Sequence, residues 1–418
     1  MLTPRVHGPT HVNSAIHAKV KPIAVTAFTT TTALGTGIAP LQTALQQQRS
    51  GLRPNDLDDI ALACWIGRVG AIESTHLPSH LQRWDCRNNR LAWLTLQQDG
   101  FMTAVEQLHQ RYPSERIAVI IGTSTASVAA SEEAYRCLDY DIHGAHFKPQ
   151  YLSPKVHSPH SLADFVQQAS HCQGPCVTLS TACSSSAKVF SHASRLLRAN
   201  LIDAAIVGGV DTLCGSVLHG FHSLQLVSST QCRPFDRHRD GLSLGEAGGF
   251  AILEHEDAVA HAPFRLLGDG ETSDAYHMSH PDPDGNGALQ AMGNALRRAG
   301  LEPEEIGYLN LHGTATAAND ITEAKAVSAL FPPSLHASST KAWTGHTLGA
   351  AGIVEAVISL LALRDCYLPG TLNCHDLDQH CGPQIQCQSA HRPIAYAMTN
   401  SFGFGGNNCS LLFGCSTR

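Results

Sequence analysis

One cysteine of the chain lies where a strand is expected to end and a helix to begin. The segment "TACSSSAKVF", residues 181–190, places Cys183 between an apolar strand and a serine run that opens a helical pattern. Unpaired N–H groups and the dipole at a helix N-terminus stabilise a thiolate, which is the nucleophilic form of cysteine. We therefore predict that Cys183 is a nucleophile, although a single cysteine is more often a small buried apolar side chain.

Two histidines occupy similar positions later in the chain. "LHGTAT" places His312 at the end of a short apolar strand, and "STKAWTGHTLGAAG" places Lys341 and His346 in a small-residue turn before another helix. One histidine among 25 carries little weight, but imidazoles at strand ends are suited to acid–base and hydrogen-bonding chemistry. We predict that both rings, uncharged, share a pocket with a Cys183 thiolate.

The elements that would bring these residues together occur twice. "RIAVIIGTSTA" (116–126) and "GYLNLHGTATA" (307–317) both read as a strand followed by GT-x-TA, and Glu132 and Glu323 follow at the same offset. The segments that carry Cys183 and His346 form a looser pair, each a short apolar strand, a small-residue turn and an amphipathic helix. Strands that alternate with helices, in duplicate, predict an α/β fold with parallel strands and a duplicated core.

The two copies differ at one informative position. When they are aligned on the GT pair, His312 replaces Ile121 at the carboxyl end of a strand, where α/β proteins tend to carry their chemistry.

We expect a flexible tail (1–20), a half that carries the nucleophile (21–264) and a half that carries the histidines and the lysine (265–418). Within the second half, "PDPDGNG" (281–287) predicts a surface turn before a helix that ends at Gly300.

The composition limits the possible functions. Hydrophobic residues make up 43% and charged residues 15% of the 418 residues, which indicates an ordered globular protein. A formal net charge of -7 argues against a nucleic-acid partner, which would need a basic surface. The longest apolar run, "GIVEAVISLLAL" (352–363), is too short to span a membrane. Fourteen cysteines without an export signal predict reduced thiols in the cytoplasm.

Other motifs give only weak evidence for other functions. "GLSLG" (241–245) matches a serine nucleophile elbow around Ser243, but a charged segment precedes it where the elbow needs an apolar strand; a serine hydrolase therefore stays a minor alternative. "DPDGNG" (282–287) lacks the acidic residue that would close a calcium loop, and no C-x-x-C pair suggests zinc, so no metal is expected. "NSFGFGGNN" (400–408) predicts a mobile glycine-rich loop and not a dinucleotide site.

Six motifs in order resemble one family. "TACSSS", "RPFDRHRDG", "SDAYHM", "LHGTAT", "STKAWTGHTLGAAG" and "NSFGFGGNN" are similar to segments of the β-ketoacyl-acyl-carrier-protein synthases, the decarboxylating condensing enzymes of the thiolase superfamily. The resemblance covers residues 23–413. It implies a thiolase-like five-layered α-β-α-β-α fold with two duplicated halves, which agrees with the internal repeat. It also implies a decarboxylative Claisen condensation of a malonyl thioester with an acyl chain, in fatty acid, aryl polyene or polyketide biosynthesis.

The resemblance also implies a role for each matching residue. Cys183 would carry the acyl chain and, with the backbone N–H of Phe404, hold the oxyanion, while His312 and His346 act on the malonyl unit. Lys341 would organise the site, and Phe404 would gate access to Cys183. Glu355 and Asp320 would have supporting roles.

The implied partners are an acyl carrier protein, whose phosphopantetheine arm carries the substrates, and a second subunit. That subunit would complete a homodimer, or a heterodimer with a chain-length-factor-like protein. Such factors lack the active cysteine, so a non-catalytic partner role for this chain is the less favoured alternative. No cofactor is expected. Arg68, Arg195 and Arg198 are candidates to dock the acidic carrier protein, although they are equally explained as solvated surface residues.

Two departures from the family pattern concern the acyl pocket. Ala342 and Trp343 stand in the turn before His346 where smaller or less aromatic residues are commoner, and the first strand, "IAVTAFTTTTALG", carries threonines in place of glycine and methionine. These changes leave the implied catalytic residues intact. They favour a specialised pathway over housekeeping fatty acid elongation.

Overall fold

The computed structural model describes residues 19–57 and 60–415. Of the predicted tail, residues 1–18 lie outside the described residues. The backbone N–H of Val20 donates to the carbonyl of Arg298 (2.8 Å), which attaches the start of the described chain to its C-terminal half.

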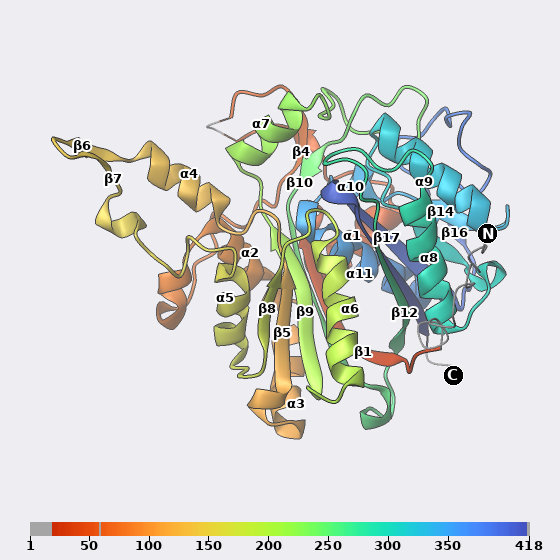
Figure 1. Ribbon diagram of the computed structural model, residues 1–418, viewed down its shortest axis with the longest axis horizontal. Coiled ribbons are helices and arrows are strands. Elements are labelled where there is room, and N and C mark those ends of the chain that lie inside the picture. Colours follow the sequence, from red (N-terminus) through yellow and green to blue (C-terminus); the bar gives the residue numbers. More distant parts are fainter. Residues whose placement is uncertain (1–18, 58–59, 416–418) are drawn as a thin grey trace, which may run out of the picture.

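The central feature of the described part of the chain is a mixed sheet of 11 strands, built from two sets of five and the short β2 (Gly35–Thr36), which pairs with β1 (Figure 1). The first set consists of β1 (Ile23–Thr32), β5 (Ile117–Gly122), β8 (Cys176–Leu179), β9 (Ala204–Asp211) and β11 (Ala247–His255). The second consists of β12 (Phe264–Ser273), β13 (Tyr308–Asn310), β14 (His336–Ser338), β17 (Tyr396–Gly403) and β18 (Asn407–Cys415).

The two sets have the same topology. The strand order is β8-β5-β9-β11-β1 in the first set and β14-β13-β17-β18-β12 in the second, so strands of equal rank take equal places. In both sets the outer three strands are parallel, as predicted, and the inner two pair antiparallel. The predicted duplication is therefore confirmed, and the repeated GT-x-TA segments follow the equivalent strands β5 and β13.

The halves join where β1 pairs with β12 over Ile23 to Val25. The first residue of β12, Phe264, is the last residue of the first half as predicted from the sequence (21–264). Helices α6 (Ser185–Arg198) and α11 (Ala351–Asp365) form the middle layer and contact strands of both halves.

Helices cover the outer faces of the sheet. The first half is covered by α2 (Arg87–Leu96), α3 (Phe101–Arg111) and α5 (Ser161–Ser170), and the second by α8 (Asn286–Ala299) and α9 (Ala317–Leu330). As predicted, α8 ends before Gly300, which adopts a left-handed conformation (φ 67°). Together these layers form the predicted α-β-α-β-α arrangement.

The hydrophobic pattern explains the layers. In β5, Ala118 and Ile120 face the middle layer, whereas Ile117, Val119 and Ile121 face the outer helices, since successive strand residues point to opposite faces. Helix α11 is buried along its whole length from Ala351 to Leu363. It is therefore buried on all sides, with Glu355 as its one buried charged residue, and the prediction that it is amphipathic was wrong.

The remaining elements are short. They include α1 (Ile38–Gln46), α4 (Val128–Arg136), α7 (Gly215–Ser223), α10 (Lys341–Thr344), β2 (Gly35–Thr36), β3 (Arg53–Pro54), β4 (Trp65–Gly67), β6 (Asp139–Asp141), β7 (Gly144–His146), β10 (Leu244–Gly245), β15 (Tyr367–Leu368) and β16 (Ala390–His391). Helix α4 and the β6–β7 hairpin project away from the body as an arm (Figure 1). Among the described residues, no helix has both the length and the apolar character needed to cross a membrane.

Candidate active site

Cys183 lies directly before the first turn of α6, as the sequence predicts. Strand β8 ends at Leu179 and α6 begins at Ser185, with Ser184 as its N-cap residue. The tight connection forces Ala182 into a left-handed conformation (φ 52°), which non-glycine residues rarely adopt. The Cys183 side chain is 5% exposed. The thiol is therefore held at the helix N-terminus in a buried pocket.

His312 follows β13, and a carboxylate fixes its backbone. Glu323 of α9 accepts hydrogen bonds from the N–H groups of His312 (2.8 Å) and Gly313 (2.7 Å). The side-chain amide of Asn400 also donates to Glu323 (3.1 Å). Burial raises the pKa of Glu323 to about 6. The sequence signalled this residue through the repeat, but its role in holding the His312 turn was not predicted.

His346 is held by the segment that contains Ser243. The N–H of His346 donates to the carbonyl of Ser243 (2.7 Å), and the His346 carbonyl accepts from the N–H of Gly245 (2.9 Å). Ser243 is fully buried, and its hydroxyl accepts a hydrogen bond from the N–H of Cys232 (3.1 Å). It therefore positions a histidine through its backbone, and the arrangement gives no support to the serine hydrolase alternative.

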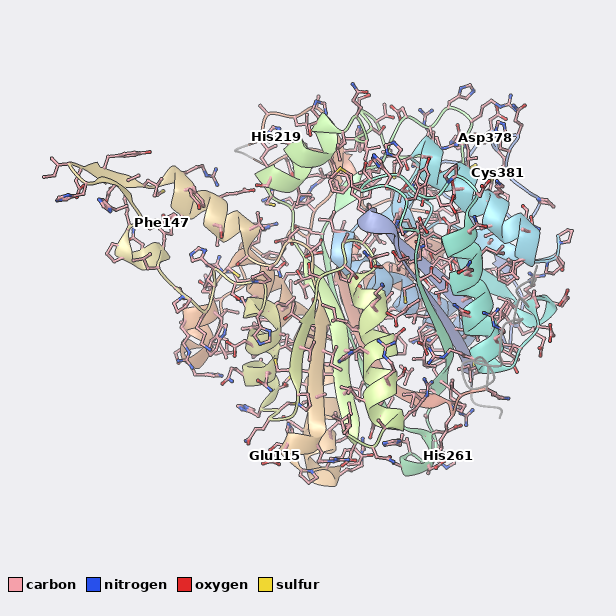
Figure 2. The ribbon with its side chains drawn as sticks, in the orientation of Figure 1. Glu115, Phe147, His219, His261, Asp378 and Cys381 are labelled. Carbon is pink, nitrogen blue, oxygen red and sulfur yellow. The ribbon has the colours of Figure 1, made fainter. Side chains whose placement is uncertain are left out.

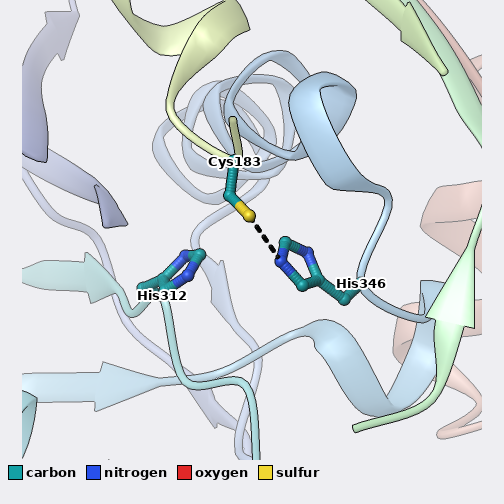
Figure 3. A group of neighbouring side chains, drawn as sticks. All are labelled: Cys183, His312 and His346. Atoms are coloured by element: carbon teal, nitrogen blue, oxygen red, sulfur yellow. Dashed lines mark hydrogen bonds between the residues drawn. The ribbon is translucent and has the colours of Figure 1, made fainter. Parts of the chain in front are cut away.

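The three predicted side chains converge (Figure 3). Nε2 of His346 lies 3.1 Å from the sulfur of Cys183, and the rings of His312 and His346 meet edge to face with centroids 5.3 Å apart. One nitrogen from each histidine and the Cys183 sulfur all lie within 4.8 Å of one another. The nucleophile thus comes from the first half of the fold and both imidazoles from the second.

The charge states agree with the predictions for the histidines but not for the cysteine. Burial and the neighbouring Lys341 ammonium hold the pKa of both His312 and His346 well below the usual range, so both rings are neutral at pH 7. Burial also raises the pKa of Cys183 to about 11, although Lys341 and the backbone N–H of Phe404 lower it in part. The raised pKa argues against the predicted resting thiolate, because desolvation outweighs the effects of Lys341 and the Phe404 N–H.

Lys341 connects His312 to Glu355. Its ammonium contacts the Glu355 carboxylate and the His312 carbonyl, and lies 3.4 Å from Nδ1 of His312. An ammonium group only donates, so Nδ1 accepts and the proton of the neutral ring is on Nε2. By contrast, Nδ1 of His346 is buried without a hydrogen-bond partner among the described residues, which leaves its tautomer free. Burial raises the pKa of Glu355 to about 7.

The glycine-rich loop lies over Cys183. A Cβ atom at Gly403 would be 2.9 Å from the carbonyl oxygen of Thr181 and 3.2 Å from the nitrogen of Cys183, so only glycine permits this approach. The ring of Phe404 stacks on Phe221 of α7 at a centroid distance of 5.4 Å. Cys183, both histidines and this loop line a cavity of about 370 Å³.

Asp320 is buried and lies next to Arg239, which lines the cavity. Its buried carboxylate accepts hydrogen bonds from the N–H groups of Phe235 (2.8 Å) and Ala315 (3.2 Å) and lies 3.5 Å from Arg239. Burial raises its pKa. Arg239, Asp240 and Thr316 line the cavity. Residues 233–241 form one of the family motifs, but the motif alone predicts no role for Arg239 or Asp240, because nothing local to that segment shows which cavity it borders.

The three candidate docking arginines have other partners. Arg195 and Arg198 belong to the last turn of α6, at the opposite end of the helix from Cys183, and pair with Glu271 and with Asp269 (3.5 Å), respectively. Arg68 pairs with Asp56 (3.2 Å) and Glu73 (2.6 Å) and borders a separate hollow. The structure therefore does not place any of the three at the mouth of the catalytic cavity.

Comparison with known proteins gives a consistent result. Residues 88–258 match the N-terminal domain and residues 264–375 the C-terminal domain of the beta-ketoacyl synthase family models. The chain is 33% identical to 3-oxoacyl-acyl-carrier-protein synthase 2 of Mycobacterium leprae over 94% of this chain and 96% of that protein.

Solved structures agree in fold over nearly the whole chain. A structure of a ketosynthase in complex with its chain length factor from Xenorhabdus doucetiae has a TM-score of 0.84 at 37% identity, and covers 95% of this chain and 98% of the matched one. A beta-ketoacyl synthase from Burkholderia phymatum has a TM-score of 0.82 at 26% identity, with 95% and 100% covered. With its motifs, fold and site geometry in agreement, this chain belongs to the β-ketoacyl synthase family.

Proposed function

We propose that this chain is a β-ketoacyl-acyl-carrier-protein synthase that binds an acyl group on Cys183 and extends it by decarboxylative condensation with a malonyl thioester. The observation that carries this proposal is the contact of 3.1 Å between the Cys183 sulfur and Nε2 of His346, beside the neutral ring of His312. A nucleophile within reach of a base, next to further hydrogen-bond donors, is the arrangement that acyl transfer requires.

In the first half-reaction, Cys183 attacks the carbonyl carbon of an acyl thioester on the phosphopantetheine arm of a carrier protein. Because the resting group is the thiol, its proton must leave as the C–S bond forms, and the neutral His346 ring can accept it. That proton then passes to the departing pantetheine thiolate. Backbone N–H groups of Cys183 and Phe404 would stabilise the oxyanion.

In the second half-reaction, the malonyl thioester loses carbon dioxide. The Nε2–H of His312, fixed by Lys341, donates a hydrogen bond to the thioester oxygen and stabilises the developing enolate. His346 can donate to the same oxygen because its tautomer is free. The enolate carbon attacks the acyl carbon on Cys183, the C–S bond breaks, and the sulfur leaves as a thiolate that takes a proton from water. The product is a β-ketoacyl thioester two carbons longer.

The reaction needs a thiol, hydrogen-bond donors and a proton acceptor, and this chain's own residues supply them; we therefore propose no cofactor. We place the reaction in the cytoplasm, where thiols stay reduced. As partners we propose an acyl carrier protein and a second subunit of the same fold. The ketosynthase from Xenorhabdus doucetiae forms a complex with its chain length factor, which favours a heterodimer and a specialised pathway for this chain.

The first prediction tests the nucleophile. The intact protein is incubated with acyl carrier-protein thioesters of different chain lengths, and its mass is measured. We expect a mass increase equal to one acyl group in the wild type and in Cys176→Ala, which removes a cysteine of β8 that is remote from the cavity. We expect none in Cys183→Ala. Acylation of Cys183→Ala at the wild-type rate would contradict the proposal, and a wild type that is never acylated would favour the non-catalytic subunit.

A further inference from the structure

Three cysteines lie in one loop of the second half. Residues 369–389 connect β15 to β16 and contain Cys374, Cys381 and Cys387 (Figure 2 labels Cys381). The sulfur atoms of Cys374 and Cys387 are 3.2 Å apart, and both residues are free thiols. A disulfide bond measures about 2.05 Å, so a closure of about 1 Å would join them. The catalytic chemistry proposed above uses neither residue.

The backbone holds the two cysteines next to each other. The N–H of Thr371 donates to the carbonyl of Gln386 (2.8 Å), and Ser389 accepts from the N–H of Gly370 (3.0 Å). A Cβ atom at Gly370 would be 2.5 Å from the carbonyl oxygen of Cys387, so the absence of a side chain lets the two segments run side by side. The thiols therefore meet because these backbone contacts hold the two segments side by side.

The two thiols are not equivalent. Cys374 is 5% exposed, whereas Cys387 is more accessible. The hydrogen bond from the Cys374 thiol lowers the pKa of Cys387, and the same contact, together with burial, raises the pKa of Cys374. Because the thiolate is the form that reacts with oxidants, Cys387 is the sulfur that an oxidant meets first.

We propose that Cys374 and Cys387 form a reversible disulfide when the protein meets a peroxide. The Cys387 thiolate attacks one oxygen of hydrogen peroxide, the O–O bond breaks, and Cys387 becomes a sulfenic acid while hydroxide leaves. The Cys374 sulfur then attacks the Cys387 sulfur, the S–O bond breaks, and water leaves with the thiol proton. In total two thiols are oxidised by two electrons and one peroxide is reduced to two waters.

The disulfide would link the two ends of a loop segment that contacts Arg239, a residue of the catalytic cavity. Asp236 accepts hydrogen bonds from the N–H groups of His375 (2.8 Å) and Asp376 (3.0 Å), and Asp378 pairs with Arg239 (2.7 Å), which lines the cavity. All three loop residues lie between the two cysteines. A cross-link reduces the freedom of the enclosed segment in the unfolded chain, so the oxidised protein should unfold at a higher temperature than the reduced one.

The test uses the full chain with Cys183 replaced by alanine, so that oxidation of the nucleophile does not interfere. Reduced protein is treated with hydrogen peroxide, alkylated, digested and analysed by mass spectrometry. Cleavage before Asp376 and Asp378 separates Cys374 from Cys387, so a bond between them yields two linked peptides, and fragmentation of the linked pair shows which cysteine of each peptide is joined. We expect this pair, a raised melting temperature, and reversal of both by dithiothreitol.

Matched variants make the result specific. Cys381→Ser removes the third thiol of the loop and should leave the cross-link intact. Cys387→Ser and Cys374→Ala should each abolish the cross-link and the peroxide-induced rise in melting temperature, while reduced Cys387→Ser should still melt cooperatively. The proposal is overturned if Cys381 pairs in place of either residue. It is also overturned if Cys374 and Cys387 stay reduced at a peroxide dose that oxidises the half-buried Cys176.

Discussion

At the scale of single residues, the reacting groups are neutral because they are buried, and they lie next to the buried pair of Lys341 and Glu355. Cys183 and both imidazoles are uncharged at pH 7, whereas Lys341 contacts the Glu355 carboxylate. The ammonium also orients His312 by donating to Nδ1 and to the backbone carbonyl. The reacting atoms are thus a thiol and two neutral rings, whereas Arg239 and Asp240 line the same cavity.

The second prediction concerns the thiol. Since burial raises the pKa of Cys183 to about 11, its thiolate fraction should grow by roughly tenfold per pH unit up to pH 10. The rate of Cys183 alkylation by iodoacetamide, measured by peptide mass spectrometry, should therefore rise without levelling over this range. A cysteine peptide should level off above its ordinary pKa of about 8.5. A plateau for Cys183 below pH 8 would show that the resting group is a thiolate.

The third prediction separates orientation from stability at Lys341. Lys341→Met leaves the buried Glu355 carboxyl without its cation, which should cost about 3 kcal/mol or more in unfolding free energy. It should also abolish malonyl decarboxylation, since the tautomer of His312 is no longer fixed. Lys341→Met with Glu355→Gln should regain most of the stability, measured by denaturant unfolding, but not the decarboxylation. Recovery of both would reduce Lys341 to a structural role.

At the scale of elements, strand ends and glycine-dependent contacts assemble the site. The positions of Cys183, His312 and His346 could be predicted because strand and turn patterns are local, and the repeat showed that their segments are equivalent. The charge of Cys183 and the role of Glu323 in holding the His312 turn could not be predicted, because both depend on burial and on partners distant in sequence. The buried α11 was mistaken for an amphipathic helix for the same reason, since its surroundings include strands from both halves.

The fourth prediction tests the close approach of the glycine-rich loop. Gly403→Ala introduces a Cβ atom at 2.9 Å from the Thr181 carbonyl oxygen, so the loop must move away from Cys183. Because a shift of about 1 Å at an active site can cost roughly 10²-fold in rate, we expect acylation of Cys183 to slow by that order. Gly220→Ala in α7, where a Cβ atom would meet nothing within 4 Å, is the control and should retain the wild-type rate. Equal rates for the two variants would show that the loop need not approach so closely.

At the scale of the whole molecule, duplication divides the chemistry between two halves. Cys183 precedes α6 and His346 precedes α11, and these helices hold equivalent places in their halves and contact each other in the middle layer. Neither half contains the complete set of groups. The site therefore exists only when the central layer is packed, which explains why the region around the thiol and the rings is so thoroughly buried.

The packing of the central layer does not account for the arm, which consists of α4 and the β6–β7 hairpin. Its apolar side chains face solvent, with Tyr140 77% and Ile142 94% exposed in the β6–β7 hairpin and Tyr135 66% exposed in α4. Clustered exposed apolar side chains mark an interaction surface. The arm projects beyond the body on the side of the first half (Figure 1), and we expect the proposed second subunit to cover it.

The fifth prediction follows from that exposure. When the chain is purified alone, the available partner is a second copy, and we expect a dimer by light scattering at micromolar concentration. Ile142→Asp places a charge on the arm surface, and the cost of desolvating it should shift the protein to the monomer. Leu201→Asp, at a residue that is 60% exposed beyond the end of α6, should remain dimeric because it lies outside the arm. If Ile142→Asp stays dimeric and Leu201→Asp dissociates, the subunits meet through the end of α6 and the arm has another role.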